Sequence, residues 1–270
     1  MQHILKKFEA FIIDMDGVLW HGDNPQPGLK VFFETLRRNH KKFILATNNA
    51  SQTSAQYLSK LAHFGIQIDI NQIITSGMAT ASYLSERYDP ALTRIFVVGE
   101  AGLEQPLLDA GFKLTEIYQV QDHNRADIVV CGKDETLTWH KLATATLNIN
   151  AGAEFYATNA DTTLPTERGV ILGNGAILAA LETATGVKPM VIGKPEPVMY
   201  QQALKVLGSS ADLTLAIGDR LETDILGAHR AGLKSILVLS GISSQSDLER
   251  IDYAPTWIMQ DIIAITEAMH

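Results

Sequence analysis

The 270-residue chain contains a single cysteine and has no excess of positive charge. Cys131 has no partner for an intrachain disulfide, and it lies in the apolar run DIVVC, where a free cysteine behaves as a small buried hydrophobic residue. Lysine and arginine number 22 against 30 aspartates and glutamates, which gives a formal net charge of −8. This composition excludes a disulfide framework and argues against nucleic acid as a partner.

Long hydrophobic runs and linker-like segments are also missing. No uninterrupted apolar stretch reaches the roughly 18 residues that a membrane-spanning helix needs. The N-terminal segment MQHILKKFEAFIIDMDG has a basic flank, but acidic residues interrupt it before the apolar region of a signal peptide can form. No low-complexity tract or block of like charges interrupts the chain. We therefore predict a soluble, cytoplasmic protein that binds neither membranes nor nucleic acid.

Short strand-like runs alternate with amphipathic segments along the first third of the chain. Residues 11–14, 42–47 and 73–76 are predicted strands. After the first of them, Leu29, Phe32, Phe33 and Leu36 have the spacing of one buried helical face. Because parallel strands need long crossover connections, this alternation predicts an α/β fold with a doubly wound, Rossmann-like parallel sheet.

The last third repeats this alternation, and the middle of the chain contains a further set of strands. Residues 190–193, 213–219 and 235–239 are predicted to join the first sheet. Residues 95–98, 128–131 and 155–158 are three more candidate strands, with a helix at 137–151. We predict a core domain of residues 1–79 and 184–270, into which a smaller α/β domain of residues 80–183 is inserted.

Two carboxylates, Asp14 and Asp16, directly follow the first predicted strand. An EF-hand calcium loop also begins with this D-x-D pattern, but it needs glycine at loop position 6 and an acidic residue at position 12. Counted from Asp14, those positions hold Leu19 and Pro25. The calcium interpretation therefore fails, which leaves a solvated turn or an acidic site.

A second acidic pair, Asp219 and Asp224, follows another apolar run in the segment IGDRLETD. Asp224 falls in the first turn of a predicted helix, where capping alone would explain it, but capping does not explain Asp219. If the two strands are neighbours, all four carboxylates converge on one sheet edge and repel each other without a cation. Ligands that offer only oxygen suit Mg²⁺, so the pattern predicts a magnesium site of Asp14, Asp16, Asp219 and Asp224.

Polar residues also follow two other predicted strands. Lys194 could offset the carboxylate repulsion and bind a phosphate as a compact cation. Thr47, Asn48 and Asn49 could donate hydrogen bonds to phosphate oxygens. The tripeptide Ala-Thr-Asn at residues 46–48 recurs at residues 157–159. The repeat either places further polar side chains at a strand end or reflects chance.

Together, these motifs resemble those of the haloacid dehalogenase superfamily. DMDGV, the strand-terminal Thr47, Lys194 and GDRLETD match its four motifs in order and spacing. The segment ATNADTTLPTERGVILGNGAILAALETATG, followed by VIGKPEP, is similar to the type IIA branch of NagD-like and 4-nitrophenyl phosphatase-like proteins. The resemblance implies a catalytic core with a type C2 cap, and it covers the whole chain.

The resemblance also implies roles for individual residues. Asp14 would be the nucleophile that becomes an aspartyl phosphate, and Asp16 the acid that protonates the leaving oxygen and then activates water. Thr47 and Lys194 would hold the phosphoryl group and the nucleophile. Mg²⁺ would be held by Asp14, the backbone carbonyl of Asp16 and Asp219, with Asp224 completing the acidic cluster.

The predicted activity is Mg²⁺-dependent hydrolysis of small phosphomonoesters such as sugar phosphates, nucleoside monophosphates and 4-nitrophenyl phosphate. Asn159, Asp161 and Arg168 are the cap residues expected to contact the substrate, although Arg168 could equally be a solvated loop charge. Trp20 and His21 either line the site entrance or are a packed aromatic and a surface histidine. A phosphotransferase or mutase, and a sensor that binds a phosphorylated metabolite without turnover, are the alternatives. The family likeness also suggests a homodimer.

Overall fold

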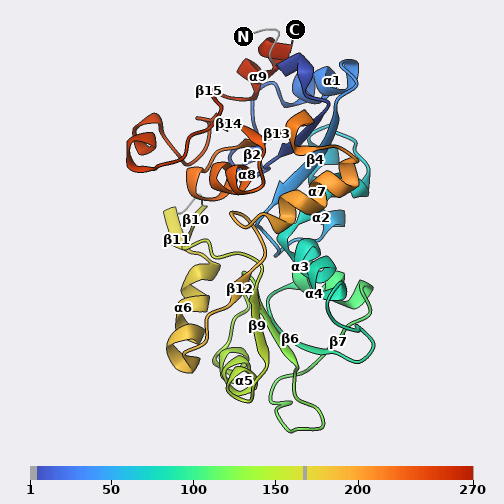
Figure 1. Cartoon of the computed structure of the whole chain (residues 1–270), viewed down its shortest axis with the longest axis vertical. Helices are drawn as coiled ribbons and strands as arrows, with labels where there is room; N and C mark the ends of the chain where they lie inside the picture. The colour runs from blue at the N-terminus through green and yellow to red at the C-terminus, as the bar shows by residue number, and fades with distance from the viewer. Residues whose placement is uncertain (1–4, 167–168, 270) are drawn as a thin grey trace. The chain divides into compact units, whose positions relative to one another are not determined.

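The computed structural model describes residues 5–166 and 169–269, which form two compact units (Figure 1). The first unit comprises residues 5–47, 55–74 and 194–269, and the second comprises residues 48–54 and 75–193 within those limits. The predicted insert of residues 80–183 therefore lies inside the second unit. Within the described ranges, no helix is long and apolar enough to cross a lipid bilayer.

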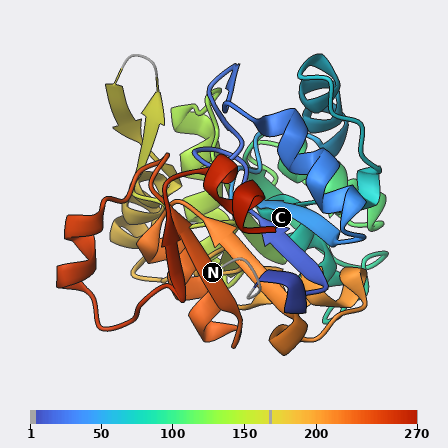
Figure 2. The same cartoon turned by 90° about the horizontal axis from the view of Figure 1, so that it is seen from above.

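The first unit is built on a six-stranded sheet in the order β15-β14-β13-β1-β4-β5, whose central strands lie side by side in Figure 2. Strands β15, β14, β13, β1 and β4 run parallel. The strands span β1 Ala10–Ile13, β4 Lys42–Thr47, β5 Ile73–Thr75, β13 Thr214–Gly218, β14 Lys234–Val238 and β15 Trp257–Met259. A short antiparallel hairpin, β2 Trp20–His21 with β3 Asn24–Pro25, follows β1.

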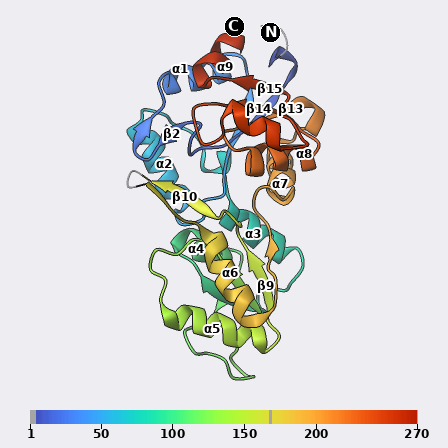
Figure 3. The same ribbon diagram turned by 90° about the vertical axis from the view of Figure 1, so that its left-hand side faces the viewer.

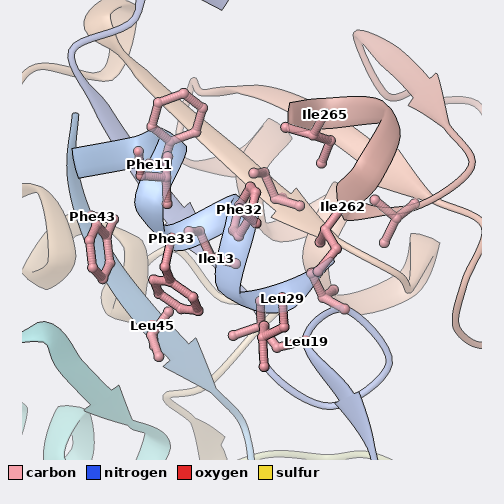
Figure 4. Close-up of a cluster of buried hydrophobic side chains, with 14 of the residues drawn as sticks. Phe11, Ile13, Leu19, Leu29, Phe32, Phe33, Phe43, Leu45, Ile262 and Ile265 are labelled. Carbon is pink, nitrogen blue, oxygen red and sulfur yellow. The ribbon is translucent and has the colours of Figure 1, made fainter. Parts of the chain in front are cut away.

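Helices cover both faces of this sheet, as a doubly wound fold requires. Helices α1, α2 and α9 contribute to the hydrophobic cluster on one face, whereas α7 contacts β1 and β4, and α8 contacts β14. Figure 4 shows the cluster: side chains of α1, including Phe32 and Phe33, pack against Phe11 and Ile13 of β1 and against Ile262 of α9. The helices span α1 Leu29–Arg38, α2 Ser54–His63, α7 Val198–Leu207, α8 Leu226–Arg230 and α9 Ile262–Met269.

The second unit has a separate parallel sheet in the order β12-β9-β8-β6-β7. Helices α5 and α6 lie side by side and share a hydrophobic cluster with β6, β8 and β9 (Figure 3). The strands span β6 Arg94–Val98, β7 Lys113–Leu114, β8 Ile128–Cys131, β9 Glu154–Ala157 and β12 Met190–Val191. The helices span α3 Ser76–Ser85, α4 Ala101–Asp109, α5 Trp139–Asn150 and α6 Asn174–Thr185, and the hairpin pairs β10 Thr163–Thr166 with β11 Gly169–Leu172.

The predicted fold class, a doubly wound α/β core with a second α/β domain, is confirmed. The assignment of residues 190–193 to the first sheet is wrong. Strand β12 pairs with β9, and the amides of Ile192 and Gly193 donate to the carbonyls of Ala157 and Thr158. An apolar run shows that a strand forms, but its partner depends on which sheet edge offers unpaired backbone groups.

Candidate active site

The site begins where two neighbouring parallel strands end. Asp14 directly follows β1 and Asp219 directly follows β13, and the backbone amide of Asp14 donates to the carbonyl of Ile217 at 2.9 Å. Ligands of open α/β sheets bind at such carboxyl ends. Carboxylate oxygens of Asp14, Asp219 and Asp224 lie within 4.8 Å of one another, so the structure brings together three of the four acids predicted to bind metal.

Asp224 is held in place by hydrogen bonds to both of its carboxylate oxygens and to its backbone carbonyl. It lies in a π-helical turn, Leu221–Ile225, between β13 and α8. Its Oδ2 accepts hydrogen bonds from the backbone amides of Asp219, at 3.2 Å, and Arg220, at 3.1 Å. The hydroxyl of Tyr200, from α7, donates to the Asp224 carbonyl at 2.9 Å. These contacts orient Oδ1 toward the ammonium group of Lys194.

Lys194 contacts the carboxylates of both Asp14 and Asp224. Its Nζ donates to Oδ1 of Asp14 at 2.5 Å, to Oδ1 of Asp224 at 2.6 Å and to the carbonyl of Ala46 at 3.0 Å. Burial alone would lower the pKa of this amine, but Asp14 and Asp224 raise it well above its usual value. Lys194 is therefore a permanent cation between two buried carboxylates.

The cluster nevertheless has more negative than positive charge. Asp14, Asp219 and Asp224 are buried, and one lysine balances only one of these three carboxylates. Burial raises the pKa of Asp14 well above its usual range, against the pull of Lys194, and Asp224 and Asp219 raise it further. Burial and Asp224 likewise raise the pKa of Asp219 to about 7. When all three carboxylates are ionised, two negative charges remain beyond the one that Lys194 balances. A buried group of oxygen ligands with this charge fits a divalent hard cation such as Mg²⁺.

Asp16 lies outside this buried group and is exposed to solvent. Its carboxylate oxygen Oδ1 accepts a hydrogen bond from the indole nitrogen of Trp20 at 2.8 Å. The next residue, Gly17, has a φ of +90°, and a Cβ at this position would lie 2.4 Å from Oδ2 of Asp219. Both the backbone conformation and the lack of space require glycine, which explains the D-x-D-G spacing.

Thr47 ends β4 at the same edge of the first sheet and is buried. Its side chain is hydrogen-bonded to the hydroxyl of Tyr57 from α2. Burial, followed by the charge of Asp16, raises the pKa of Tyr57 well above its usual value, so this hydroxyl stays neutral. Tyr57 therefore restrains the threonine hydroxyl without adding charge to the site.

The predicted substrate-binding amides form a separate polar group within the second unit. Asn48 donates to both carboxylate oxygens of Asp161, at 3.3 and 3.4 Å, and Asn159 donates to the Asn48 carbonyl at 2.9 Å. These three residues and Asn49 line a pocket of about 40 Å³, together with Lys133, Thr163, Leu164, Gly173 and Asn174. The repeated ATN letters thus lead to two asparagines in contact. Asn49 also accepts hydrogen bonds from Ser51, which closes the local turn.

Some predicted residues lie elsewhere, and others were not predicted at all. Arg168 is outside the described residues. His21 is exposed and hydrogen-bonded to the Ser240 carbonyl, whereas Trp20 is fully buried. Tyr57 of α2 and Tyr200 of α7 are both buried. A helical hydrophobic pattern can indicate burial of a tyrosine, but it gives no indication of what its hydroxyl binds. Such polar contacts between distant segments have no signal in a single sequence.

Comparisons with known proteins cover almost the whole chain. A family model for haloacid dehalogenase-like hydrolases matches residues 11–113, and a HAD-hydrolase-like model matches residues 191–265. The acid sugar phosphatase of Staphylococcus epidermidis is 35% identical over 97% of this chain and 99% of its own length. The crystal structure of 4-nitrophenylphosphatase from Thermotoga maritima superposes with a TM-score of 0.91 at 34% identity, covering 99% of this chain and 100% of that one.

A third relative was solved with a metal. The glycerol phosphate phosphatase of Mycobacterium tuberculosis, crystallised in complex with magnesium, is 35% identical and has a TM-score of 0.88. The match covers 97% of this chain and 77% of that one. Identity of this level over nearly the full length means that the chain belongs to the haloacid dehalogenase-like hydrolases, in their NagD-like branch.

Proposed function

We propose that this protein is a Mg²⁺-dependent phosphatase that hydrolyses small phosphomonoesters through an aspartyl phosphate. The main support is the contact between Asp14 and Lys194 within a buried group of carboxylates at the ends of β1 and β13. The full-length similarity to sugar, glycerol and 4-nitrophenyl phosphate phosphatases supports the same reaction class. Sugar phosphates, nucleoside monophosphates and 4-nitrophenyl phosphate are the proposed substrates.

In the first proposed step, a carboxylate oxygen of Asp14 attacks phosphorus and the bond to the leaving oxygen breaks. The proton of Asp16 passes to that oxygen, so the product leaves as an alcohol. In the second step, Asp16 takes a proton from water, and the hydroxide attacks phosphorus and displaces the Asp14 carboxylate. Inorganic phosphate and the original enzyme result. The exposure of Asp16 and the burial of Asp14 suit this division of roles.

Other residues are proposed to bind the phosphoryl group and the rest of the substrate. Thr47 and Lys194 would hold the phosphoryl group and the nucleophile, because a hydroxyl and an ammonium group lie at the sheet edge. In the second unit, the pocket residues Asn48, Asn49, Asn159 and Asp161 would contact the leaving group, as would Arg168.

Magnesium is the cation that best matches the charge and ligand type of the cluster. Asp14, Asp219 and Asp224, with the backbone carbonyl of Asp16, would hold it. When bound, Mg²⁺ supplies positive charge that offsets the carboxylates and the substrate phosphate. After Lys194 has offset one carboxylate, the ionised cluster still carries excess negative charge. A single lysine is therefore insufficient to bind a dianionic substrate there.

Three further features are proposals about the whole protein. Residues 80–183 would act as a type C2 cap that selects the leaving group, because they contribute most of a unit with its own sheet and hydrophobic cluster. A homodimer and a cytoplasmic location complete the proposal. Light scattering of the purified protein and fractionation of the source cells would test the last two.

The activity itself is tested by phosphate release from 4-nitrophenyl phosphate, sugar phosphates and nucleoside monophosphates, with Mg²⁺ or with a chelator. Metal-dependent release from at least one of them is the expected result. Transfer of the phosphoryl group to a second metabolite would indicate a phosphotransferase or mutase instead. Tight binding of a phosphorylated metabolite without any release would indicate a sensor.

We predict that Mg²⁺ stabilises the protein more strongly at pH 8 than at pH 5.5. The pKa of Asp219 is raised to about 7 in the folded state, above its usual value of 3.8. Between pH 3.8 and about pH 7, the folded state therefore holds more protons than the unfolded state. Without metal, stability therefore falls as pH rises through this window, by at most about 1.4 kcal/mol per pH unit from this group. Above pH 7 Asp219 is ionised in the folded state, so the full loss of stability applies. A bound cation offsets this loss.

Thermal unfolding in chelator and in Mg²⁺, at both pH values, measures this effect. Asp219→Asn should be less sensitive to pH and should lose most of the Mg²⁺ response. Asp23→Asn, at an almost fully exposed aspartate, is the matched control and should behave like the wild type. An equal Mg²⁺ response in wild type and Asp219→Asn would contradict the assignment of the metal to this cluster.

A further inference from the structure

We propose that Trp20 is a positioning residue for Asp16, holding one carboxylate oxygen so that the other exchanges the proton during catalysis. This inference rests on the proposed function, in which Asp16 is the acid and base. Its structural basis is the 2.8 Å hydrogen bond from the indole nitrogen of Trp20 to Oδ1 of Asp16.

The chemistry of the indole group determines which oxygen is held. An indole N–H can only donate, so it needs an oxygen with an available lone pair. A neutral carboxylic acid keeps such an oxygen in its carbonyl group, while the proton is on the other oxygen. The hydrogen bond therefore persists in both protonation states when Oδ1 is the carbonyl oxygen, which leaves Oδ2 of Asp16 as the atom that gives and takes the proton.

Asp16 needs this restraint because it is exposed, whereas the donor does not move easily. A solvent-exposed carboxylate can rotate among several rotamers, and proton transfer requires a single geometry. Trp20 is fully buried, and its ring lies 5.9 Å from that of Phe64, centroid to centroid. The tightly packed indole group thus restrains, through this hydrogen bond, the Asp16 side chain, which has few packing contacts of its own.

Backbone and charge contacts fix the tryptophan further. The amide of Gly17 donates to the Trp20 carbonyl at 2.8 Å, and Asp16 and Trp20 form an isolated β-bridge. The ammonium group of Lys60 lies 5.0 Å from the indole ring centroid, within the range of a cation–π contact. Lys60 is itself anchored by a 2.7 Å hydrogen bond to the Gly22 carbonyl, in the hairpin that contains Trp20. These contacts therefore fix the turn of residues 16–22, which contains both Asp16 and Trp20.

The leaving group provides a readout that general destabilisation would not change selectively. The sugar phosphate that is hydrolysed fastest needs a proton on its departing alkoxide oxygen, whereas 4-nitrophenolate leaves as a delocalised anion. Because general acid catalysis contributes about 10²–10⁴-fold, Trp20→Phe should lower kcat/KM for that sugar phosphate by about tenfold or more. The fall for 4-nitrophenyl phosphate should be less than about threefold, since the same general acid matters little for that leaving group.

Two variants serve as controls. Trp257→Phe makes the same substitution at a partly buried residue that packs against the same hydrophobic cluster and lies edge-on to Phe8. It should leave the ratio of the two kcat/KM values unchanged. In an Asp16→Asn background, Trp20→Phe should cause no further change in that ratio. Equal losses on both substrates in Trp20→Phe, or the same change of ratio in Trp257→Phe, would overturn the proposal.

A spectroscopic measurement tests the contact independently of turnover and of whether Trp20→Phe folds. The chain has three tryptophans, so ¹⁵N labelling gives three indole N–H resonances. Asp16→Ala, at an exposed position, should move the Trp20 resonance and leave those of Trp139 and Trp257 in place. An unmoved Trp20 resonance would refute the hydrogen bond. A shifted resonance in a protein that hydrolyses no phosphomonoester would refute the proposed function and leave the contact intact.

Discussion

Asp14→Asn should reduce phosphomonoester hydrolysis by at least about 10³-fold while the protein stays folded. The amide oxygen of asparagine is a poor nucleophile and carries no full negative charge, so the bond to phosphorus does not form. The substitution keeps the size of the side chain and leaves an oxygen that can still accept the hydrogen bond of Lys194. It also removes one of three crowded carboxylates, so we expect no loss of thermal stability in metal-free buffer.

Steady-state phosphate release and trapping of ³²P-labelled protein after rapid acid quenching together measure this effect. Wild type should become labelled on an acid-stable, hydroxylamine-sensitive acyl phosphate, and Asp14→Asn should not. Asp122→Asn, at a fully exposed aspartate of the second unit, is the matched control and should retain wild-type rates. Retention of label or of more than a tenth of the activity in Asp14→Asn would exclude Asp14 as the nucleophile.

Lys194→Met should have the largest effect on stability, in addition to abolishing activity. The lysine is buried between Asp14 and Asp224, and its removal leaves both carboxylates without their cation. Breaking a buried ion pair by removing one partner costs about 3–5 kcal/mol. The raised folded-state pKa of Lys194 means that its stabilising effect is fully present below its usual pKa of 10.5 and is lost only as pH rises through the folded value.

The loss should therefore be measurable at pH 8 in chelator, by urea or thermal unfolding. It should be smaller at pH 5.5, because Asp219, with its pKa of about 7, is then protonated and the cluster holds less charge. Lys188→Met, at a lysine that is 81% exposed and 3.6 Å from Glu182, should change stability by less than about 0.5 kcal/mol. A Lys194→Met protein as stable at pH 8 as the wild type would show that the buried carboxylates are already neutral there.

Much of the first unit could be predicted from local patterns. The strand at residues 42–47 matches β4, and the helical face from Leu29 to Leu36 matches α1, because side-chain period and burial are local properties. The same reasoning predicted that acids after two apolar runs would meet, since carboxyl ends of neighbouring parallel strands share one edge. Asp14 and Asp219 do meet there.

The partners of individual groups could not be predicted in this way. Residues 190–193 have the pattern of a strand, yet β12 joins β9 of the second sheet. Trp20 was expected either at the site entrance or packed in the core, and it is buried with its one polar atom on Asp16. The pairing of β12 with β9 depends on segments that are far apart in sequence. The bond of Trp20 to Asp16 depends on how one turn folds, which the pattern of hydrophobic residues does not indicate.

The sequence by itself therefore determined the α/β class, the order of the chemical groups and the sheet edge at which they gather, because these follow from hydrophobic period and chain direction. Only the tertiary structure decided how the charges of that edge are shared. Lys194 is shared between Asp14 and Asp224, backbone amides hold Asp224, and burial raises the pKa of Asp219 to about 7. The physical reason is that electrostatic energies depend on distance and on exclusion of water, and neither is specified until distant segments have packed together.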